Sequence, residues 1–406
     1  MKLFNTRRPI TMIVLLNVLG YGLLSFSGQN YDKDMLYVGL AVIGMLCFSY
    51  ILTSKFGVQD GYIFLIVSML FSIGEIMLYR LDGYYGYRQL KWLAISLICF
   101  FVIYFFIMKF NFWPKLGYLY YLLAMMLLIA TMLIGTTRGG AKNWIFFGNY
   151  GFQPSEIVKV LSVFFIADRF NRPDKYRFYN IYEGLVASIM IYIIIGLMLL
   201  QREWGTAILV FVVFISLLYI FGEKKRIIIA NILLCSIGCV LGALFVSHIK
   251  TRIDVWLDPW TDMTGKGYQI TQSLFAIGSG GFFGSGIGLG SPEYIPEVHS
   301  DFIFSAICEE FGVLGSVAVI MLYFLLVYRG IRISMKVNNI FYRCVSAGIS
   351  ILFGFQTFII LGGVIKLIPL TGITLPFVSY GGSSLLISFC AVAVLEAIAN
   401  KNYASQ

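Results

Sequence analysis

Charged side chains are scarce in this sequence. Only 12% of its 406 residues are Asp, Glu, Lys or Arg, whereas 59% are hydrophobic and the mean hydropathy is +0.85. A soluble domain has about 25% charged and about 45–50% apolar residues, so this chain cannot cover a globular surface with solvated groups. The composition excludes a cytosolic enzyme, a nucleic-acid-binding module and a disordered chain, and it predicts a polytopic membrane protein.

Histidine and cysteine, which build many metal sites, are also few. There are two histidines, His248 and His299, and seven cysteines, an odd number without any Cys-x-x-Cys pair. This pattern favours neither a disulfide framework nor a zinc site. The net charge of +10 does not call for a nucleic-acid partner, because membrane proteins gather Lys and Arg in their cytoplasmic loops.

Long apolar segments make up most of the chain. A membrane-spanning helix needs about 20 apolar residues, and twelve segments are near this length or somewhat shorter. They fall near residues 9–27, 35–53, 59–79, 89–108, 117–136, 155–168, 181–200, 204–222, 227–247, 302–328, 343–365 and 381–399. The seventh and eighth are separated only by Gln201–Trp204 and are also compatible with one long broken helix. The sequence therefore predicts an all-α integral membrane protein, a polytopic bundle of about 12 transmembrane helices.

The distribution of basic residues predicts the orientation of this bundle. With the N-terminus inside, more than half of the 30 Lys and Arg residues fall in inner loops, and the short loops 169–180, 222–226 and 329–343 decide the choice. Both termini are then cytoplasmic. One long hydrophilic segment, 248–301, lies on the outer face, and long loops of this kind usually have a function.

Two aspartates stand four residues apart in this outer segment, Asp258 and Asp262, with Pro259 between them. Pro259 prevents one continuous helix through both. A turn after it would present Asp262 beside Gly265 and Gly267, where backbone can approach a substrate closely. A carboxylate in such a place acts as a general base for a sugar hydroxyl or as a metal ligand. The alternative is a solvated turn residue.

The end of the outer segment, residues 292–304, contains three further polar candidates. These are Glu297, His299 and Asp301, and the span that follows contains Glu309–Glu310. Charges inside a span are expensive and are by default functional or paired. His299 is expected to hydrogen-bond a neighbouring carboxylate rather than to act as a base, and helix capping is the alternative role for Asp301.

A third block of charges precedes the sixth span. Arg138 and Lys142 stand before it, on the outer side in this orientation, where they suit an anionic head group. Pro154 suits a first helical turn, which places Glu156 and Lys159 three residues apart on one face. An ion pair inside a short span is either a functional site or a structural contact that holds the helices together.

Two glycine-rich segments predict irregular backbone. The run Gly278–Gly290 follows no expected strand and has no lysine at the offset of a nucleotide-binding loop, so it indicates closely packed backbone. The segment Leu375–Ser384 combines Pro376 with Gly381 and Gly382 at membrane depth. Irregular backbone there is tolerated only where it is buried in protein or lines a cavity.

Four of these segments, taken in their order along the chain, resemble the SEDS family of bacterial cell-wall proteins, the RodA, FtsW and SpoVE group. The match runs from Tyr79-Arg80-Leu81 to Ser384 and is sharpest over residues 152–159, 258–272, 296–304 and 375–384. The resemblance implies a peptidoglycan glycosyltransferase. Such enzymes polymerise lipid II at the outer face of the cytoplasmic membrane, usually alongside a class B penicillin-binding protein.

The resemblance also implies roles for residues. The family's essential loop aspartate falls on Asp262, which is the expected catalytic residue, and Asp258 ranks lower. The expected substrate-binding residues, taken from the family pattern and from charge, are Arg138, Lys142, Glu156, Lys159, Lys266, Glu297, His299, Asp301, Ser379 and Ser383. No ligand cluster commits the chain to a metal, so no cofactor is assigned, and a divalent cation remains compatible with the chemistry.

The sequence departs from the family pattern in three places. Arg202–Thr206 stands where the family usually has Pro-Asp-Leu-Gly-Thr, and Met263 replaces a usual Pro. The family has ten spans, so the first two here resemble an N-terminal addition. The implied organisation is 1–56 as the extra helix pair, 57–400 as the membrane core and 401–406 as a short cytoplasmic tail.

The mechanism implied is glycosyl transfer between two lipid II molecules in the membrane. Asp262 would deprotonate the acceptor 4-hydroxyl, which would attack the donor anomeric carbon with inversion and expel undecaprenyl diphosphate. Two other functions are compatible with parts of the pattern. A lipid II flippase would line a polar path with Glu156, Lys159 and Glu309–Glu310, and a non-catalytic scaffold would recruit a penicillin-binding protein.

Overall fold

The computed structural model describes residues 7–27, 33–57, 61–138, 140–148, 150–172 and 183–404, so part of the loop 169–180 used for the orientation lies outside it. The chain divides into two compact units. Unit 1 comprises Met1–Val102, Thr251–Leu326 and Thr357–Glu396, and unit 2 comprises Ile103–Lys250, Val327–Gln356 and Ala397–Gln406.

Unit 1 is built from long helices and the outer segment. Its elements, several of which continue into unit 2, are α1 (Arg7–Ser27), α2 (Lys33–Lys55), α3 (Gly61–Leu81), α4 (Gly83–Lys109), α10 (Ser247–Leu257), η3 (Pro259–Asp262), α11 (Tyr268–Ser279), η4 (Pro292–Tyr294), α12 (Ile303–Lys336), α13 (Ile340–Val364) and α14 (Gly382–Ala404). Gly312 interrupts α12 with a left-handed φ of 64°. Only a glycine takes up this conformation without steric cost, so the helix kinks there.

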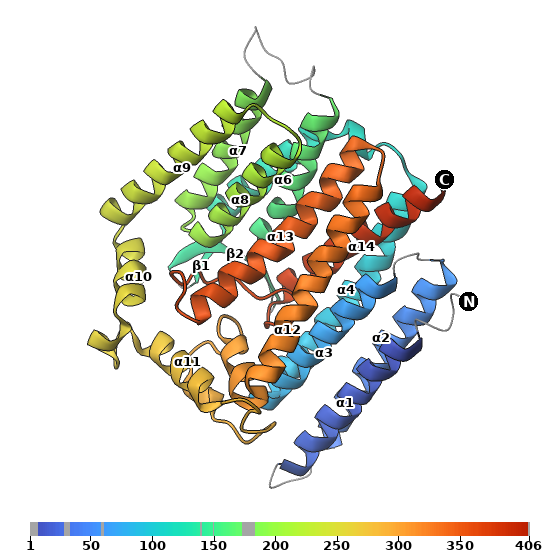
Figure 1. The fold of residues 1–406 in the computed structure, drawn as a ribbon, viewed down its shortest axis with the longest axis vertical. Helices are drawn as coiled ribbons and strands as arrows, with labels where there is room; N and C mark the ends of the chain where they lie inside the picture. Colours follow the sequence, from blue (N-terminus) through green and yellow to red (C-terminus); the bar gives the residue numbers. More distant parts are fainter. Residues whose placement is uncertain are drawn as a thin grey trace. The chain divides into compact units, whose positions relative to one another are not determined.

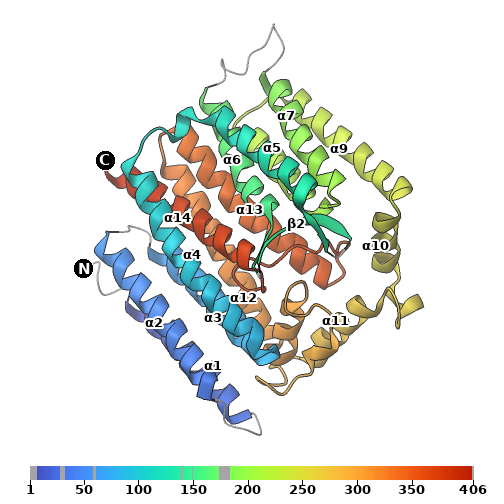
Figure 2. The ribbon, with the colours of Figure 1, turned by 180° about the vertical axis from the view of Figure 1, so that it is seen from behind.

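Helices α1, α2 and α3 lie side by side (Figures 1 and 2). The contact between α1 and α3 includes a buried hydrogen bond, in which Asn17 Nδ2 donates to Ser72 Oγ at 2.8 Å. Tyr21 of α1 packs edge-on against Tyr79 of α3. A polar bond between apolar helices fixes their register, because an unmade bond would leave both groups unsatisfied.

Unit 2 contains a helical bundle and a small sheet. Its own elements are η1 (Trp113–Lys115), α5 (Gly117–Ile134), β1 (Thr136–Arg138), β2 (Ala141–Phe147), β3 (Tyr150–Phe152), α6 (Pro154–Asn171), α7 (Glu183–Leu200), α8 (Trp204–Ile220) and α9 (Lys225–Phe245). The three strands form an antiparallel sheet in the order β1-β2-β3, with Thr136 opposite Trp144 and Phe146 opposite Gly151. The sequence did not predict this sheet, which follows α5 directly (Figure 2).

The region between the seventh and eighth predicted spans is a turn rather than a helix. Helix α7 ends at Leu200, and α8 begins at Trp204 and packs against α7. Arg202 has a left-handed φ of 63°, which interrupts a right-handed helix and has a steric cost for a residue other than glycine. The alternative of one long broken helix is therefore wrong.

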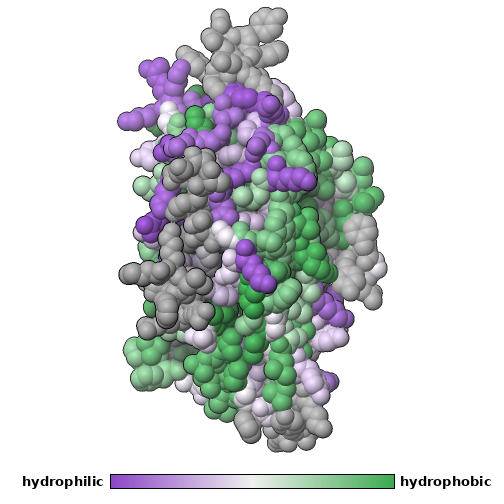
Figure 3. All heavy atoms as spheres, turned by 90° about the vertical axis from the view of Figure 1, so that its right-hand side faces the viewer, coloured by the Kyte–Doolittle hydropathy of each residue, from purple (hydrophilic) through white to green (hydrophobic). Residues whose placement is uncertain are grey.

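Each of the twelve predicted apolar segments coincides with a helix. Within the described residues, eight helices are long and apolar enough to cross a membrane, and α1, α7 and α8 contain shorter apolar stretches. Helix α6 is not among these eleven, and it contains Glu156, Lys159, Asp168 and Arg169. Figure 3 shows a face with a broad area of hydrophobic residues. On α9, Leu244 and Phe245 are 69% and 80% exposed. The chain is a multi-pass membrane protein.

Candidate functional site

Asp262 lies at the end of a short turn in the outer segment of unit 1. Asp258 caps the 3-10 helix η3 by accepting a hydrogen bond from the Trp260 N–H at 3.0 Å, and Pro259 takes the first position. The turn brings Asp262 round so that its Oδ2 accepts the Lys266 N–H at 3.0 Å. The predicted turn after Pro259 is confirmed. The Asp262 carboxylate is exposed and oriented by backbone.

The two glycines beside Asp262 permit this arrangement. A Cβ at Gly265 would lie 2.4 and 2.5 Å from the two Asp262 carboxylate oxygens. A Cβ at Gly267 would lie 2.2 Å from the Pro259 carbonyl oxygen. Both separations are too short for a real contact. At Gly267 the obstacle is backbone, so the turn requires glycine there, whereas a side chain at Gly265 would displace the Asp262 carboxylate. The Lys266 side chain between them is exposed.

His299 lies in an aromatic group of unit 1. Its ring stacks on Tyr85 with centroids 4.1 Å apart, and Tyr380 meets it edge-on at 5.8 Å. Its Nε2 is 3.6 Å from Glu297 Oε2, so the predicted carboxylate neighbour is present, at ion-pair rather than hydrogen-bond distance. Glu297 has a left-handed φ of 54°. These contacts fix the imidazole ring, which suits orientation more than proton transfer.

Asp301 faces a cation rather than capping a described helix. A Cβ at Gly372 would lie 3.4 Å from Arg252 Nη2 and 3.6 Å from Asp301 Oδ2, so both charged groups lie against the same glycine. Arg252 Nη1 also donates to the Leu370 carbonyl at 2.6 Å. Burial raises the pKa of Asp301 to about 6, against the lowering effect of Arg252.

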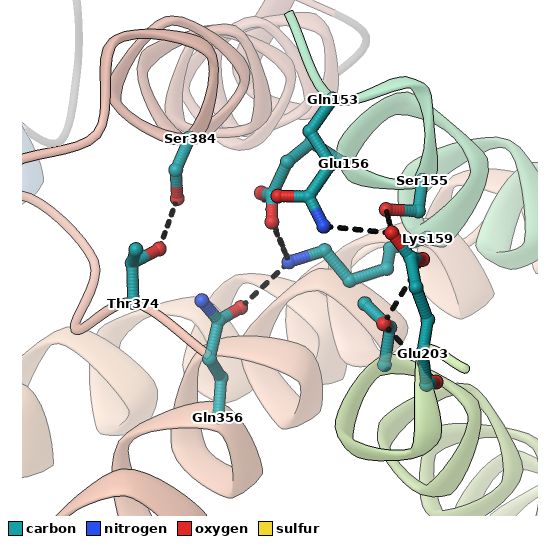
Figure 4. A network of polar contacts seen from close by, with 9 residues as sticks. Gln153, Ser155, Glu156, Lys159, Glu203, Gln356, Thr374 and Ser384 are labelled. Atoms are coloured by element: carbon teal, nitrogen blue, oxygen red, sulfur yellow. Dashed lines mark hydrogen bonds and ion pairs between the residues drawn. The ribbon is translucent and has the colours of Figure 1, made fainter. Parts of the chain in front are cut away.

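The irregular segment 375–381 is buried and held by hydrogen bonds within unit 1. Ser379 Oγ donates to the Ser300 carbonyl at 2.5 Å and accepts the Leu375 N–H at 3.0 Å. The Tyr380 N–H donates to the His299 carbonyl at 2.8 Å. The structure thus brings Ser379 together with the segment that contains Glu297, His299 and Asp301. Beyond it, Thr374 Oγ1 donates to Ser384 Oγ at 2.8 Å (Figure 4), and Ser383 is buried.

The glycine-rich run is closely packed, as predicted, and the structure places it against α12. A Cβ at Gly280 would lie 2.0 Å from the Cys308 carbonyl oxygen. Glu309 accepts the Ser291 N–H at 2.9 Å, and Glu310 accepts the Gly288 N–H at 3.0 Å. These two glutamates therefore accept hydrogen bonds from the backbone at the end of the run.

Arg80 of α3 completes this arrangement in unit 1. Its Nε donates to Glu310 Oε1 at 2.5 Å, and its Nη2 donates to the Gly290 carbonyl at 2.6 Å. An arginine can satisfy a carboxylate and a carbonyl at once because its donors form a rigid fork. Arg80 thus ties α3 to both the run and α12.

In unit 2, Glu156 and Lys159 form a buried pair one helical turn apart on α6. Lys159 Nζ lies 2.9 Å from Glu156 Oε2 and donates to Gln356 Oε1 at 3.1 Å (Figure 4). The two side chains are 6% and 2% exposed. A charge removed from water is tolerated only when it is paired and hydrogen-bonded, and this pair meets both conditions.

Glu203 anchors a neighbouring polar group of unit 2. Its Oε1 accepts from Gln153 Nε2 at 2.8 Å and from Ser155 Oγ at 3.0 Å, and its Oε2 accepts from Thr206 Oγ1 at 3.3 Å (Figure 4). Burial raises the pKa of Glu203, and the hydrogen bond from Gln153 opposes this effect. The turn between α7 and α8 is thereby fastened to the start of α6.

The two cations predicted before α6 belong to the sheet region. Arg138 ends β1, where it pairs with Ala141, but the position of its side chain lies outside what the structure describes. Lys142 lies in β2 and is exposed, and its Nζ donates to the Met132 carbonyl at 2.6 Å. Lys142 therefore reaches back to the end of α5.

The sequence did not identify several residues that hold these groups together: Arg80, Tyr85, Arg252, Gln356 and Tyr380. Of these five residues, Gln356 has the clearest signal in the sequence, because it is an amide within an apolar segment. Glu203 was noted only as part of a departure from the family pattern. Among the described residues, no three His, Cys, Asp or Glu side chains gather as a metal site would require.

Comparisons with known proteins agree with the geometry. The family model described as "Cell cycle protein", which groups FtsW, RodA and SpoVE, matches residues 60–404. The peptidoglycan glycosyltransferase RodA of Mycobacterium bovis is 30% identical over 97% of this chain and 91% of its own length. The probable peptidoglycan glycosyltransferase FtsW of a Geobacter species is 38% identical over 67% of this chain and 74% of its own length.

Solved structures share the fold. One, described as showing structural coordination of polymerization and crosslinking by a peptidoglycan synthase complex, matches with a TM-score of 0.72 and 24% identity over 85% of this chain and 98% of that chain. The rod shape determining protein RodA of Thermus thermophilus matches with a TM-score of 0.64 and 24% identity over 85% of this chain and 97% of that chain.

The helical membrane fold and the family match together define the class. The chain belongs to the FtsW, RodA and SpoVE family, also known as the SEDS family. Helices α1 and α2 precede the residues that the family model matches.

Proposed function

We propose that this protein is a peptidoglycan glycosyltransferase that polymerises lipid II into glycan strands. The observation that supports this most directly is the exposed Asp262 carboxylate, oriented by the Lys266 N–H and made possible by Gly265. Relatives that align over nearly the whole chain have the name of this activity. A carboxylate fixed by backbone but open to solvent is suited to take a proton from an incoming hydroxyl.

The proposed reaction is a single displacement. The Asp262 carboxylate accepts the proton of the acceptor's GlcNAc 4-hydroxyl as its oxygen attacks the anomeric carbon of the donor's MurNAc. The new glycosidic bond forms as the bond to phosphate breaks, and the electron pair leaves on undecaprenyl diphosphate. Attack opposite the leaving group inverts the anomeric centre. The leaving diphosphate is stabilised by cations, and Lys266 supplies an exposed one in the same turn as Asp262.

Apart from the Glu156–Lys159 pair, the remaining candidate residues are proposed to bind or orient substrate. Glu297, His299, Asp301 and Ser379 form one bonded group in unit 1, and Ser383 lies just beyond it. In unit 2, Lys142 and Arg138 are proposed to meet the anionic part of a lipid. The charge of Lys159 is balanced by Glu156, so this pair is proposed to hold α6 in place. A divalent cation is compatible with the chemistry, since diphosphate leaving groups are often metal-bound.

The orientation and partners follow from the same proposal. Both termini lie in the cytoplasm, and the segment 248–301 with its active site lies outside. The partner is a class B penicillin-binding protein, in keeping with the synthase complex among the structural matches. Residues 1–56 are an extra helix pair, 57–400 the core and 401–406 a short tail.

The contacts of Glu309 and Glu310 argue against the flippase. A polar path through the membrane needs groups that are available to a passing substrate. Glu310 is instead bonded to Arg80 and the Gly288 N–H. Glu309 is buried and accepts the Ser291 N–H with Oε1, while its Oε2 has no hydrogen-bond partner among the described residues. A scaffold, for its part, has no need of a carboxylate oriented as Asp262 is.

The test is polymerisation of labelled lipid II by the purified protein, with a cognate penicillin-binding protein whose transpeptidase is blocked. We expect glycan strands from the wild type and none from Asp262→Ala. A parallel assay follows lipid II across vesicle membranes. Strands from neither protein, with lipid II still crossing, would contradict the proposal and favour the flippase. Strands from both would remove Asp262 from the mechanism.

A further inference from the structure

A small pocket opens in unit 2 where the β-sheet meets the turn between α7 and α8. It has a volume of about 240 Å³ and is lined by Thr137, Gly140, Lys142, Leu200, Gln201 and Arg202. Pockets for whole drug-sized ligands are typically about 300–1,000 Å³. This pocket therefore has the size of a head group rather than of a disaccharide.

Among the described residues, the charge of the lining is positive. Lys142 and Arg202 are the only ionisable residues in this part of the lining, and both are exposed. The nearest acid in sequence, Glu203, is 5% exposed and bonds to Gln153 and Ser155 instead. Two cations without a lining carboxylate favour an anion.

Most donors of these two cations remain available. Lys142 Nζ uses one of its three N–H groups on the Met132 carbonyl. Arg202 Nη1 makes a long contact of 3.4 Å to the Gly140 carbonyl, one of its five N–H groups. Both side chains line the pocket. Arg202 also has the left-handed φ of 63°, a conformation that costs energy and often marks functional positions.

The surroundings of the pocket indicate a lipid. It lies at the ends of α5 and α7, where Leu133, Ile134 and Leu200 are 74%, 66% and 69% exposed. Exposed apolar residues at the end of membrane helices lie against acyl chains, and cations just beyond them lie at the depth of head-group phosphates.

We propose that this pocket binds the phosphate group of a membrane lipid, and that the Lys142 and Arg202 side chains donate hydrogen bonds to it. Two sources share this chemistry, an anionic phospholipid and the polyprenyl diphosphate of the glycosyl donor. The second source rests on the proposed function. Arg202 stands within a departure from the family pattern.

The test is equilibrium binding to the full-length purified protein in a non-ionic detergent. The probes are fluorescent phosphatidylglycerol, the matched diacylglycerol without phosphate, and undecaprenyl diphosphate as a competitor. We expect the phosphate-bearing probe to bind at least about tenfold tighter than diacylglycerol, and Arg202→Gln to lose about tenfold, the effect of roughly one charged hydrogen bond. Arg202→Lys restores part of the binding, and Arg202→Gln with Lys142→Gln loses more.

The matched control is Lys225→Gln with Arg226→Gln, which removes two exposed cations near the opposite end of α8. This variant should bind as the wild type does, which excludes a general charge effect. Wild-type binding by the Arg202 and Lys142 double variant, or equal binding of diacylglycerol, would overturn the proposal. Competition by undecaprenyl diphosphate at lower concentration than by phosphatidylglycerol assigns the site to the donor, and equal competition assigns it to lipid phosphates in general. Since no polymerisation is measured, an inactive transferase would leave this result intact.

Discussion

The two units hold their most prominent charged groups in opposite ways. In unit 1, Asp262 is exposed and has one backbone partner, the Lys266 N–H. In unit 2, Glu156 and Lys159 are buried and bonded to each other, and Lys159 also bonds to Gln356. An exposed carboxylate is free to exchange a proton with a substrate, whereas a buried pair is committed to its own partners.

This difference separates a reacting group from a supporting one. Both kinds of site look alike in sequence, as charges beside glycine or proline near an apolar span. Removal of a reacting group should abolish turnover without unfolding the protein, and removal of half of a buried pair should do the reverse.

Asp262→Asn should lower lipid II polymerisation by roughly 10²–10⁴-fold, the usual contribution of a general base. The thermal unfolding midpoint in detergent should stay within about 1–2 °C of the wild type, because an exposed side chain adds little to stability. The rate of strand formation and the melting curve are measured on the same preparation. Asp258→Asn is the control, and its loss of rate should be much smaller because Asp258 only caps the turn.

Lys159→Met should destabilise the protein by about 3–5 kcal/mol, the cost of leaving one buried charge without its partner. The measurement is thermal unfolding in detergent. The double variant Glu156→Gln with Lys159→Met removes both charges and should recover much of the loss. If the single variant melts like the wild type, the pair is not the internal support described here.

Gly265→Ala should lower polymerisation by about 10²-fold, since an error of about 1 Å in a reacting group has this effect. The new Cβ would lie 2.4 Å from Asp262 Oδ1 and would push the carboxylate aside. Gly278→Ala is the matched control, because nothing lies within 4 Å of its Cβ position. Equal rates for the two alanine variants would show that the position of the Asp262 carboxylate is unimportant.

The pH dependence of stability should reflect Asp301, with the smallest effect. Its pKa is raised from 3.8 to about 6 in the folded protein, so the folded state binds a proton more tightly than the unfolded state does. The stability that this provides is complete below pH 3.8 and is lost as the pH rises through about 6. The melting midpoint of the wild type should therefore change by about 1–3 °C between these two pH values, and Asp301→Asn should remove this change.

Arg252→Gln sharpens this last measurement. The Arg252 guanidinium lowers the pKa of Asp301, so its removal should move the transition to higher pH. A transition that stays in place would mean that another group titrates in this range.

Sequence reasoning located the helices and the Asp262 turn because their signals are local. Apolar runs of the right length define the helices, and Pro259 with Gly265 and Gly267 defines the turn. The three-stranded sheet was missed because β1 and β3 have three residues each, too few for an alternating pattern to stand out.

Long-range partners were missed for a different reason. Arg80 meets Glu310, 230 residues away, and Lys159 meets Gln356, 197 residues away. No periodicity within one segment indicates such a pairing. The sequence indicated that Glu309–Glu310 would be functional or paired. Only the fold shows that Arg80 and the glycine-rich run bond to Glu310 and that the Ser291 N–H bonds to one oxygen of Glu309.

The roles of the two sites are separated by a comparison of Asp262→Asn with Glu156→Gln, each assayed for lipid II polymerisation and for thermal unfolding in one preparation. We predict that Asp262→Asn loses polymerisation and keeps its melting midpoint, whereas Glu156→Gln loses several degrees in its midpoint and keeps measurable polymerisation below it. An active Asp262→Asn beside a fully stable but inactive Glu156→Gln would contradict the account and place the chemistry at the buried pair.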